Sequence, residues 1–247
     1  MSLGVYGLGR FGYFYAEMLS RLTPVAAYSR NPERAVPEGV QKAGLDELCA
    51  CDTIVLCVSI SAMPAVLKGL APRLRPGQLV MDTCSVKVQP AAWMQEYLPG
   101  EVSLMASHPM FGPDSARGSL QDLPITLWPL RASDSQLDSW RTSFSALGLR
   151  VLEMSPERHD RIAAYTQGVT HFIGRVLEEL ESQDSEIATR GYKQLLEVKQ
   201  QTCNDPWQLF LDLQRYNPFT GDMRRDLARA LDTVMRKIQV DSPQGRT

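Results

Sequence analysis

Short apolar runs alternate with longer helix-forming stretches from the start of the chain to about Met154. The apolar runs read LGVYG, VAAYS, TIVLCVS, QLVMDT, SLMAS, ITLWPL and LRVLEM. Strands that alternate with helices in this way are typical of a parallel sheet joined by crossover helices. The pattern therefore predicts an α/β domain over residues 1–155.

After Ser155 the pattern changes, because Pro and Gly become sparse and apolar residues recur at the helical period. The clearest stretches are HDRIAAYTQGVTHFIGRVLEELES and DMRRDLARALDTVMRKIQ. We predict a smaller, all-α domain over residues 156–247, with a loose tail, DSPQGRT, at its end. The second stretch is expected to pack on its own domain or on a partner subunit rather than on a membrane or nucleic acid.

Composition limits the kinds of molecule that the protein is expected to bind. The 247 residues carry 26 basic and 28 acidic side chains, so no net field favours nucleic acid or anionic lipid. No apolar run approaches the roughly 20 residues of a membrane span, and the first residues lack a basic leader region. The five cysteines form an odd set without a CxxC pair, which is typical of free thiols in a reducing compartment. We expect a cytoplasmic protein with a small-molecule partner and no metal.

A glycine cluster follows the first predicted strand. Gly7, Gly9 and Gly12 form GxGxxG directly before the helical run YFYAEMLSRL. In this context the glycines predict a tight turn, close approach of a pyrophosphate, and a helix start that attracts anions. The alternative is that they serve only the turn. Arg10 either adds charge near the phosphates or is a solvated residue at the helix start. We predict a Rossmann-type, doubly wound sheet that binds a dinucleotide.

The end of the second predicted strand favours one cofactor. Ser29, Arg30 and Arg34 follow Tyr28, and no acidic residue stands where an NAD enzyme places one to hold the ribose hydroxyls. A hydroxyl and guanidinium groups suit a 2′-phosphate, which Arg binds through charge-assisted hydrogen bonds. The sequence therefore predicts NADP(H) rather than NAD(H).

One of the chain's three histidines lies in the segment ASHPMFGPDSARGS. His108 follows a strand-like run, so we expect it at a strand's carboxyl end, where open α/β sheets bind ligands. Histidine, with a pKa of about 6.5, is the usual acceptor of a hydroxyl proton when hydride leaves for a nicotinamide. Ser85, in DTCSVK after the preceding strand, is expected in the same crevice or as a plain helix N-cap. Lys87 is expected on a solvated helix face.

The other two histidines fall in the first stretch of the helical domain. At about 100° per residue, Asp160, Gln167 and His171 lie within roughly 40° of each other, on a stripe of polar and small residues. We predict that this stripe lines a substrate pocket; the alternative is a face exposed to water. His159 lies off the stripe and is expected at a helix end or behind the site. The opposite, apolar stripe is expected to pack inward and comprises Ile162, Val169, Phe172 and Val176.

Five segments resemble the prephenate/arogenate dehydrogenase family of tyrosine biosynthesis in order and spacing. They are GLGRFG, DTCSVK, SHPMFGPDS, ERHD and THFIGR. The later segments TQGVTHFIGR and LFLDLQRYNP resemble the plant-type arogenate dehydrogenases most. The resemblance covers nearly the whole chain and implies NADP-dependent oxidative decarboxylation of arogenate or prephenate. Hydride leaves ring C4, the 4-hydroxyl becomes a carbonyl, and the ring carboxylate departs as CO₂.

The resemblance also implies roles for individual residues. His108 binds and deprotonates the 4-hydroxyl, Ser85 orients it, and His171 contacts the substrate. A homodimer formed through the helical domain is a further expectation.

The chain departs from the family pattern at one position, because Gln200 stands where many bacterial members carry an arginine for a substrate carboxylate. Since a buried carboxylate needs a cation, Arg175 is the first candidate, with Arg117 and Lys199 behind it. Asp160 is a candidate partner for the ammonium group of arogenate, which prephenate lacks.

Two other interpretations remain open. A different dehydrogenase or an imine reductase of similar fold would usually carry a lysine on the helix of the second domain, where this chain has THFIGR. A non-catalytic NADPH sensor would keep the glycines and Arg30 but would have no reason to hold His108, Ser85 and His171 together. The sequence does not decide between arogenate and prephenate.

Overall fold

A computed structural model describes residues 2–240, so the segment DSPQGRT lies outside the described residues. The chain divides into two compact units, Met1–His159 and Asp160–Thr247. Among the described helices, none is both long enough and apolar enough to cross a membrane.

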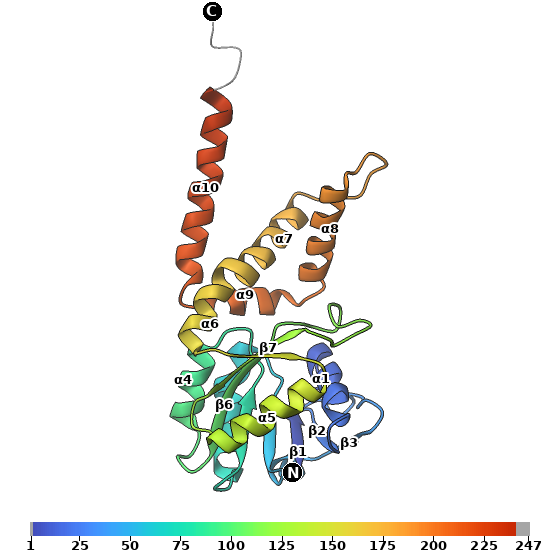
Figure 1. The fold of residues 1–247 in the computed structure, drawn as a ribbon, viewed down its shortest axis with the longest axis vertical. Helices are drawn as coiled ribbons and strands as arrows, with labels where there is room; N and C mark the ends of the chain where they lie inside the picture. The colour runs from blue at the N-terminus through green and yellow to red at the C-terminus, as the bar shows by residue number, and fades with distance from the viewer. Residues whose placement is uncertain (1, 241–247) are drawn as a thin grey trace, which may run out of the picture. The chain divides into compact units, whose positions relative to one another are not determined.

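The first unit is built on an eight-stranded sheet with the order β3-β2-β1-β4-β5-β6-β7-β8 (Figure 1). Every neighbouring pair is parallel except β6 and β7. The strand order reverses between β1 and β4, which is where doubly wound sheets bind ligands. The predicted Rossmann-type class is confirmed. The strands are β1 (Leu3–Tyr6), β2 (Val25–Tyr28), β3 (Val40–Lys42), β4 (Thr53–Leu56), β5 (Leu79–Asp82), β6 (Ser103–Pro109), β7 (Pro124–Pro129) and β8 (Arg150–Glu153).

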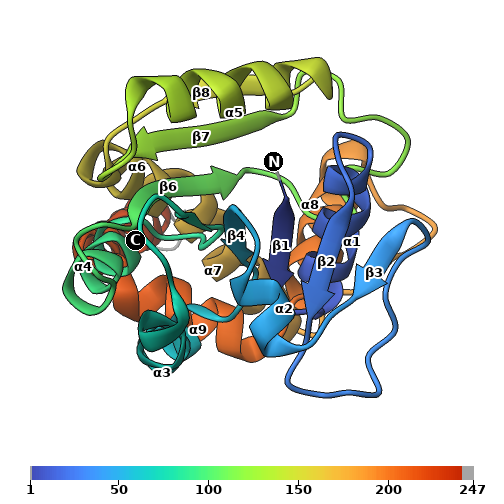
Figure 2. The same cartoon turned by 90° about the horizontal axis from the view of Figure 1, so that it is seen from below.

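Helices cover both faces of this sheet, because the central strands are buried at successive positions and so present apolar side chains to both sides. Leu3 and Val5 of β1 join the core that contains α1 and α5. Gly4 points to the other face, where an added Cβ would lie 2.8 Å from Leu48 of α2. Figure 2 shows α5 lying along β7 and β8. The helices of the first unit are α1 (Arg10–Ser20), α2 (Leu45–Cys49), α3 (Met63–Leu70), α4 (Val88–Tyr97) and α5 (Asp134–Ala146), with short 3₁₀ turns η1 (Ile60–Ala62) and η2 (Ala71–Arg73).

The described residues of the second unit are helical, which confirms the predicted all-α region. Its first helix, α6, begins before the boundary at His159. The helical period of the sequence predicts one helix here, but a π-helical segment divides it in two. The elements are α6 (Pro156–Ala163), η3 (Ala164–Gly168), α7 (Val169–Glu179), α8 (Arg190–Cys203), α9 (Trp207–Tyr216) and α10 (Thr220–Val240).

The side of α7 that carries small residues is the side buried against α8. Gly174 packs so closely on α8 that an added Cβ would clash with the Thr202 hydroxyl. The polar stripe is therefore buried at His171, whereas Ile162 and Val176 remain 45% and 38% exposed. The expectation that the apolar stripe packs inward is wrong for these two residues. For Val176 the reason is that α8 approaches α7 closely over Gly174, on the side of the small residues.

Candidate active site

The glycine cluster forms the connection from β1 to α1, and its three glycines meet different surroundings. Gly7 has a φ of +108°, and an added Cβ would clash with the carbonyl of Cys57. A Cβ on Gly12 would clash with the carbonyl of Gly7. Gly9, directly before α1, has nothing within 4 Å of an added Cβ. Two glycines thus permit the tight turn and close packing, and the third leaves open space at the helix start.

A cavity of about 520 Å³ lies at this turn, within the first unit. The start of α1 presents backbone amides there, which suits the pyrophosphate of a dinucleotide. No acidic side chain is among the described residues that line the cavity. The cavity is lined by Tyr6, Gly7, Leu8, Gly9, Ser29, Arg30, Asn31, Arg34, Cys57, Val58, Ser59 and Ala62.

The cationic side chains at the cavity follow β2 in a hydrogen-bonded turn. The Asn31 amide donates to Ser29 Oγ at 3.3 Å, and the Arg34 amide donates to the Asn31 carbonyl at 3.2 Å. This turn places Arg30 and Arg34 at the cavity, where both are exposed. The arrangement fits a dinucleotide with a phosphate on its adenosine ribose.

Arg10 and Cys57 also lie near the glycine turn. Arg10 forms an ion pair with Asp114, in the loop after β6, and Asp114 also pairs with Arg117 at 2.9 Å. Burial raises the pKa of the Cys57 thiol to about 12, so this cavity-lining cysteine stays protonated and is no nucleophile at neutral pH.

His108 lies near the carboxyl end of β6 and is 4% exposed. Its Nδ1 lies 2.8 Å from Nε2 of His159, in the first turns of α6, and the ring planes meet at 65°. His159 is also buried. Sequence reasoning placed His159 behind the site but did not identify His108 as its partner, since no sequence spacing relates a strand end to a helix so far along the chain.

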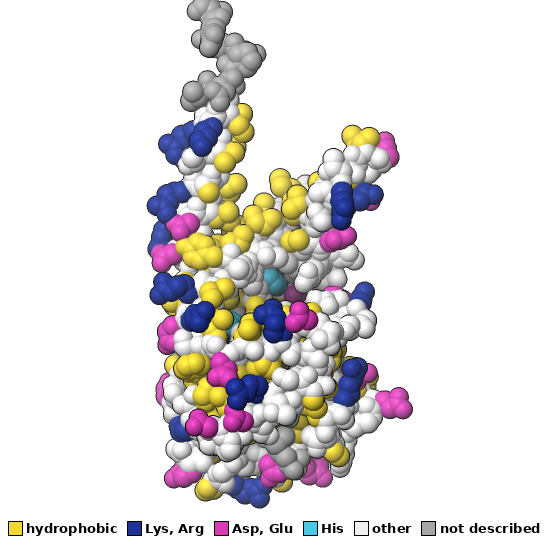
Figure 3. Space-filling view, in the orientation of Figure 1, with side chains coloured by type: hydrophobic (Ala, Val, Ile, Leu, Met, Phe, Trp, Pro, Cys, Tyr) yellow, Lys and Arg dark blue, Asp and Glu magenta, His cyan; other side chains and the backbone are white. Residues whose placement is uncertain are grey.

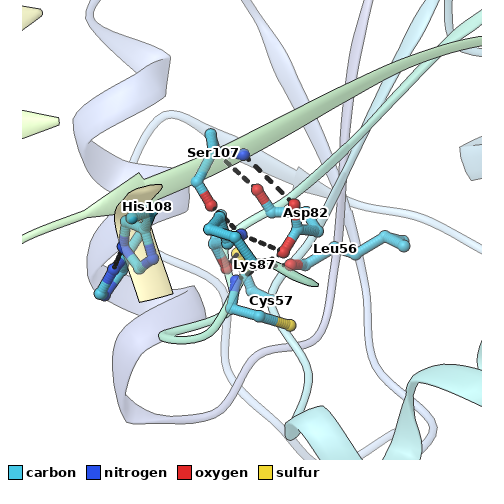
Figure 4. A network of polar contacts seen from close by, with 9 residues as sticks. Leu56, Cys57, Asp82, Lys87, Ser107 and His108 are labelled. Carbon is cyan, nitrogen blue, oxygen red and sulfur yellow. Dashed lines mark hydrogen bonds and ion pairs between the residues drawn. The ribbon is translucent and has the colours of Figure 1, made fainter. Parts of the chain in front are cut away.

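A buried polar network fixes the strand next to His108 (Figure 4). The Lys87 ammonium donates to the Asp82 carboxylate and to the Ser107 carbonyl. The Ser107 amide donates back to Asp82 Oδ1 at 3.2 Å. The solvated position expected for Lys87 is wrong, because the side chain is 3% exposed and reaches the carboxyl ends of β5 and β6. The sequence does contain a signal for this ion pair, because the acidic Asp82 ends a buried strand five positions before Lys87.

Ser85 lies in the connection from β5 to α4 and is half-buried. Lys87, not Ser85, holds the N-cap position of α4, so the plain-cap interpretation of Ser85 is wrong. Because β5 and β6 are parallel neighbours, Ser85 and His108 lie at the same edge of the sheet.

The second unit contains the remaining candidate residues, and several of their polar atoms are buried without a partner. Among the described residues, nothing hydrogen-bonds to His171 Nδ1, Gln167 Oε1 or Arg175 Nε. Burial, with a smaller contribution from the charge of Arg175, lowers the pKa of His171 to about 4, so its ring is neutral at pH 7. Gln167 belongs to the π-helical segment η3, and such segments occur frequently at functional sites.

The candidate cations are held in different ways. Arg175 Nη2 donates to the carbonyls of Thr202 at 3.1 Å and Asp205 at 2.8 Å, and its guanidinium lies over the ring of Trp207. Lys199 pairs with Glu178 at 3.0 Å. Arg175 is thus the half-buried candidate that retains an unpartnered donor.

Asp160 is fully buried, and its backbone carbonyl accepts a hydrogen bond from the side-chain Nδ2 of Asn217 at 2.8 Å. No group of three or more described His, Cys, Asp or Glu side chains is arranged to hold a metal ion.

Comparison with known proteins agrees with the fold. The family model "Prephenate dehydrogenase, nucleotide-binding domain" matches residues 23–153, and "TYRAAT1-like, C-terminal domain" matches residues 176–244. Arogenate dehydrogenase 2, chloroplastic, of Arabidopsis thaliana is 33% identical over 250 residues, which cover 96% of this chain and 70% of that protein. Arogenate dehydrogenase 1, chloroplastic, of the same plant is 34% identical over 230 residues, which cover 88% of this chain and 36% of its own length.

The structure of Synechocystis arogenate dehydrogenase superposes with a TM-score of 0.69 over 97% of this chain and 92% of that one, at 22% identity. That likeness shows the shared fold. Because the nucleotide-binding family model covers residues 23–153 and the first Arabidopsis relative aligns over 96% of the chain, this protein belongs to the prephenate/arogenate dehydrogenase family.

Proposed function

We propose that this chain catalyses the NADP-dependent oxidative decarboxylation of arogenate or prephenate. The observation that carries the proposal is a buried histidine, His108, at the carboxyl edge of a sheet whose glycine turn opens a dinucleotide-sized cavity in the same unit. Family membership supports the same reaction, because the relatives are named for arogenate dehydrogenation.

His108 is the proton acceptor in this proposal. Its Nε2 takes the proton of the substrate 4-hydroxyl, and the Ser85 hydroxyl orients that group. A nicotinamide dinucleotide held at the glycine turn would supply the acceptor for the hydride that leaves ring C4. Loss of the ring carboxylate as CO₂ then leaves an aromatic product. The buried position of His108 keeps water from competing for the proton.

NADP is the proposed cofactor. Arg30 and Arg34 lie at the cavity with Ser29, and the described residues of the lining include no carboxylate that would bind ribose hydroxyls or repel a 2′-phosphate. The start of α1 and Gly9 are proposed to hold the pyrophosphate, with Arg10 released from Asp114 as a further cation.

The second unit carries the groups proposed to bind the rest of the substrate. His171, Gln167 and Arg175 have buried polar atoms without partners in the described part of the chain, and a ligand would supply the missing hydrogen bonds. Arg175 is the proposed partner of a substrate carboxylate. The buried carboxylate of Asp160 is proposed to bind the ammonium of arogenate.

A homodimer is proposed to form through the second unit. Leu231, Val234, Met235 and Ile238 recur on one side of α10 and are each more than half exposed. Figure 3 shows these hydrophobic side chains as a band along α10. A continuous exposed apolar band of this kind marks an interaction surface rather than scattered surface residues.

Replacement of the proposed base tests the reaction. His108→Asn is expected to lower kcat by about 10²–10⁴-fold, because general-base catalysis is lost while the side chain remains small and polar. Absorbance of the reduced nicotinamide would be followed with arogenate and with prephenate, and NADPH affinity would serve as the control. No turnover of either substrate by the unaltered protein contradicts the proposed function, and full activity of the variant contradicts the role of His108.

Cofactor choice is tested at the cavity. Arg30→Ala is expected to raise the KM for NADP by about tenfold or more and to leave the KM for NAD nearly unchanged, because a charge-assisted hydrogen bond contributes about 1.5–3 kcal/mol. Arg21→Ala, an exposed arginine of the same unit outside the cavity lining, is the matched control. An equal effect of Arg30→Ala on both cofactors argues against a 2′-phosphate site here.

Substrate choice is tested at Asp160. Asp160→Asn keeps the size of the side chain and removes its charge, so kcat/KM for arogenate is expected to fall about tenfold or more relative to prephenate. Steady-state kinetics with both substrates measure the ratio. An unchanged ratio shows that Asp160 does not bind the ammonium group.

The apolar band on α10 is tested by sedimentation. The unaltered protein is expected to sediment at twice the chain mass of 27.6 kDa, and Met235→Glu is expected to shift it toward the monomer. Arg236→Glu introduces the same side chain on the opposite side of the helix and should leave the mass unchanged. A monomeric unaltered protein would rule out the dimer.

A further inference from the structure

The two rings of His108 and His159 share one hydrogen bond. Nδ1 of His108 and Nε2 of His159 are 2.8 Å apart, and the ring centroids are 5.0 Å apart. Each neutral imidazole carries one N–H and one acceptor nitrogen, so one ring must donate and the other must accept. The direction of this bond decides which nitrogen of His108 carries its proton.

Only one direction leaves His108 able to act as a base. If His108 donates through Nδ1, its Nε2 keeps a lone pair that can accept the substrate proton. If His159 donates instead, His108 carries its proton on Nε2 and can accept none there. We propose that His159 is a positioning residue, which accepts the Nδ1 proton of His108 and thereby holds Nε2 of His108 ready as the base. This inference rests on the proposed function.

The same bond supports His108 after proton transfer. When Nε2 takes the substrate proton, His108 becomes an imidazolium, and its Nδ1–H still donates to the neutral ring of His159. The bond is then charge-assisted and roughly twice as strong as before. His159 therefore stabilises the protonated base without adding a negative charge to a buried site.

Backbone hydrogen bonds fix the positions of both histidines. His108 is the β-sheet partner of Thr126 across β6 and β7. Ser107, beside His108, is held by the Asp82–Lys87 ion pair. The His159 amide donates to the Ser155 carbonyl at 2.9 Å, at the start of α6. The geometry of the ring contact is thus set by a strand on one side and a helix start on the other.

Nitrogen-15 NMR of the imidazole rings tests the direction of the bond without reference to turnover. The chain has three histidines, so the spectrum contains three rings, and replacement of each in turn assigns them. The unaltered protein is expected to show His108 protonated on Nδ1 and His159 unprotonated on Nε2. A proton on Nε2 of His108 overturns the inference, whatever the activity of the protein.

Two matched variants connect the bond to catalysis. His159→Gln places an amide oxygen near the position of Nε2 and keeps an acceptor, whereas His159→Leu has none. We expect kcat to fall less than about tenfold for the glutamine variant and about 100-fold or more for the leucine variant, with KM for both substrates nearly unchanged. Equal losses in both variants mean that His159 only fills space, and they overturn the inference.

Failure of the two proposals can be told apart. If the unaltered protein turns over neither substrate, the proposed function is wrong, and the NMR spectrum still supports or overturns the assigned bond. If it turns over substrate while His108 carries its proton on Nε2, the function holds and the role of His159 is wrong. Should His159→Leu fail to fold, the spectrum of the unaltered protein and the kinetics of His159→Gln decide the question.

Discussion

The buried ion pair between Asp82 and Lys87 joins the carboxyl ends of β5 and β6, and the position of His108 depends on it. Burying two charges is costly unless their remaining donors and acceptors are satisfied. Here the Asp82 carboxylate also accepts hydrogen bonds from the backbone amides of Cys84 and Ser107. The Lys87 ammonium also donates a hydrogen bond to the Ser107 carbonyl. Two of these contacts, from the Ser107 amide to Asp82 and from Lys87 to the Ser107 carbonyl, hold the residue that precedes His108. Removal of either charge would leave the other buried and unpaired, at a cost of about 3–5 kcal/mol.

The direction of the strands explains how one unit can bring together the proposed cofactor site and the proposed base. β1, β4, β5 and β6 are parallel, so their carboxyl ends meet at one edge of the sheet. The glycine turn follows β1, Ser85 follows β5, and His108 stands near the end of β6. Side chains that are distant in the sequence therefore share an edge without any need for an unusual connection. The antiparallel strand β7 then pairs with β6 and fixes the register of His108.

Sequence reasoning was most reliable where a residue's role is set by its immediate neighbours. The α/β alternation predicted the sheet, and the glycine spacing predicted a turn that the positive φ of Gly7 and the contacts of Gly12 explain. It failed where the deciding partner is remote. Lys87 was placed in solvent although its carboxylate partner Asp82 is five positions earlier, because its other acceptor, the Ser107 carbonyl, comes 20 positions later. The contact between His108 and His159 spans 51 positions, and no helical or strand period relates such residues.

The helix around His171 is a second place where the sequence pattern did not predict which side chains are buried. A period of 3.6 residues assigned the apolar stripe to the interior, but the period carries no information on which side a neighbouring helix can approach. Gly174 admits Thr202 of α8, and this contact buries the polar stripe instead. The π-helical segment also changes the angle between residues on either side of it, so a single helical wheel cannot describe Asp160 and His171 together.

The buried polar stripe has an energetic consequence for function. An unpaired polar atom in the interior costs about 1–3 kcal/mol, and the stretch from Gln167 to Arg175 holds three of them among the described residues. The lowered pKa of His171 adds to this cost below pH 6.5, because the folded ring resists a proton that the unfolded ring would bind. A fold that served only stability would place apolar side chains here, as it does in the core of the sheet. Under the proposed function a polar substrate would complete these hydrogen bonds, so the feature that weakens the helical unit by itself would contribute to substrate binding.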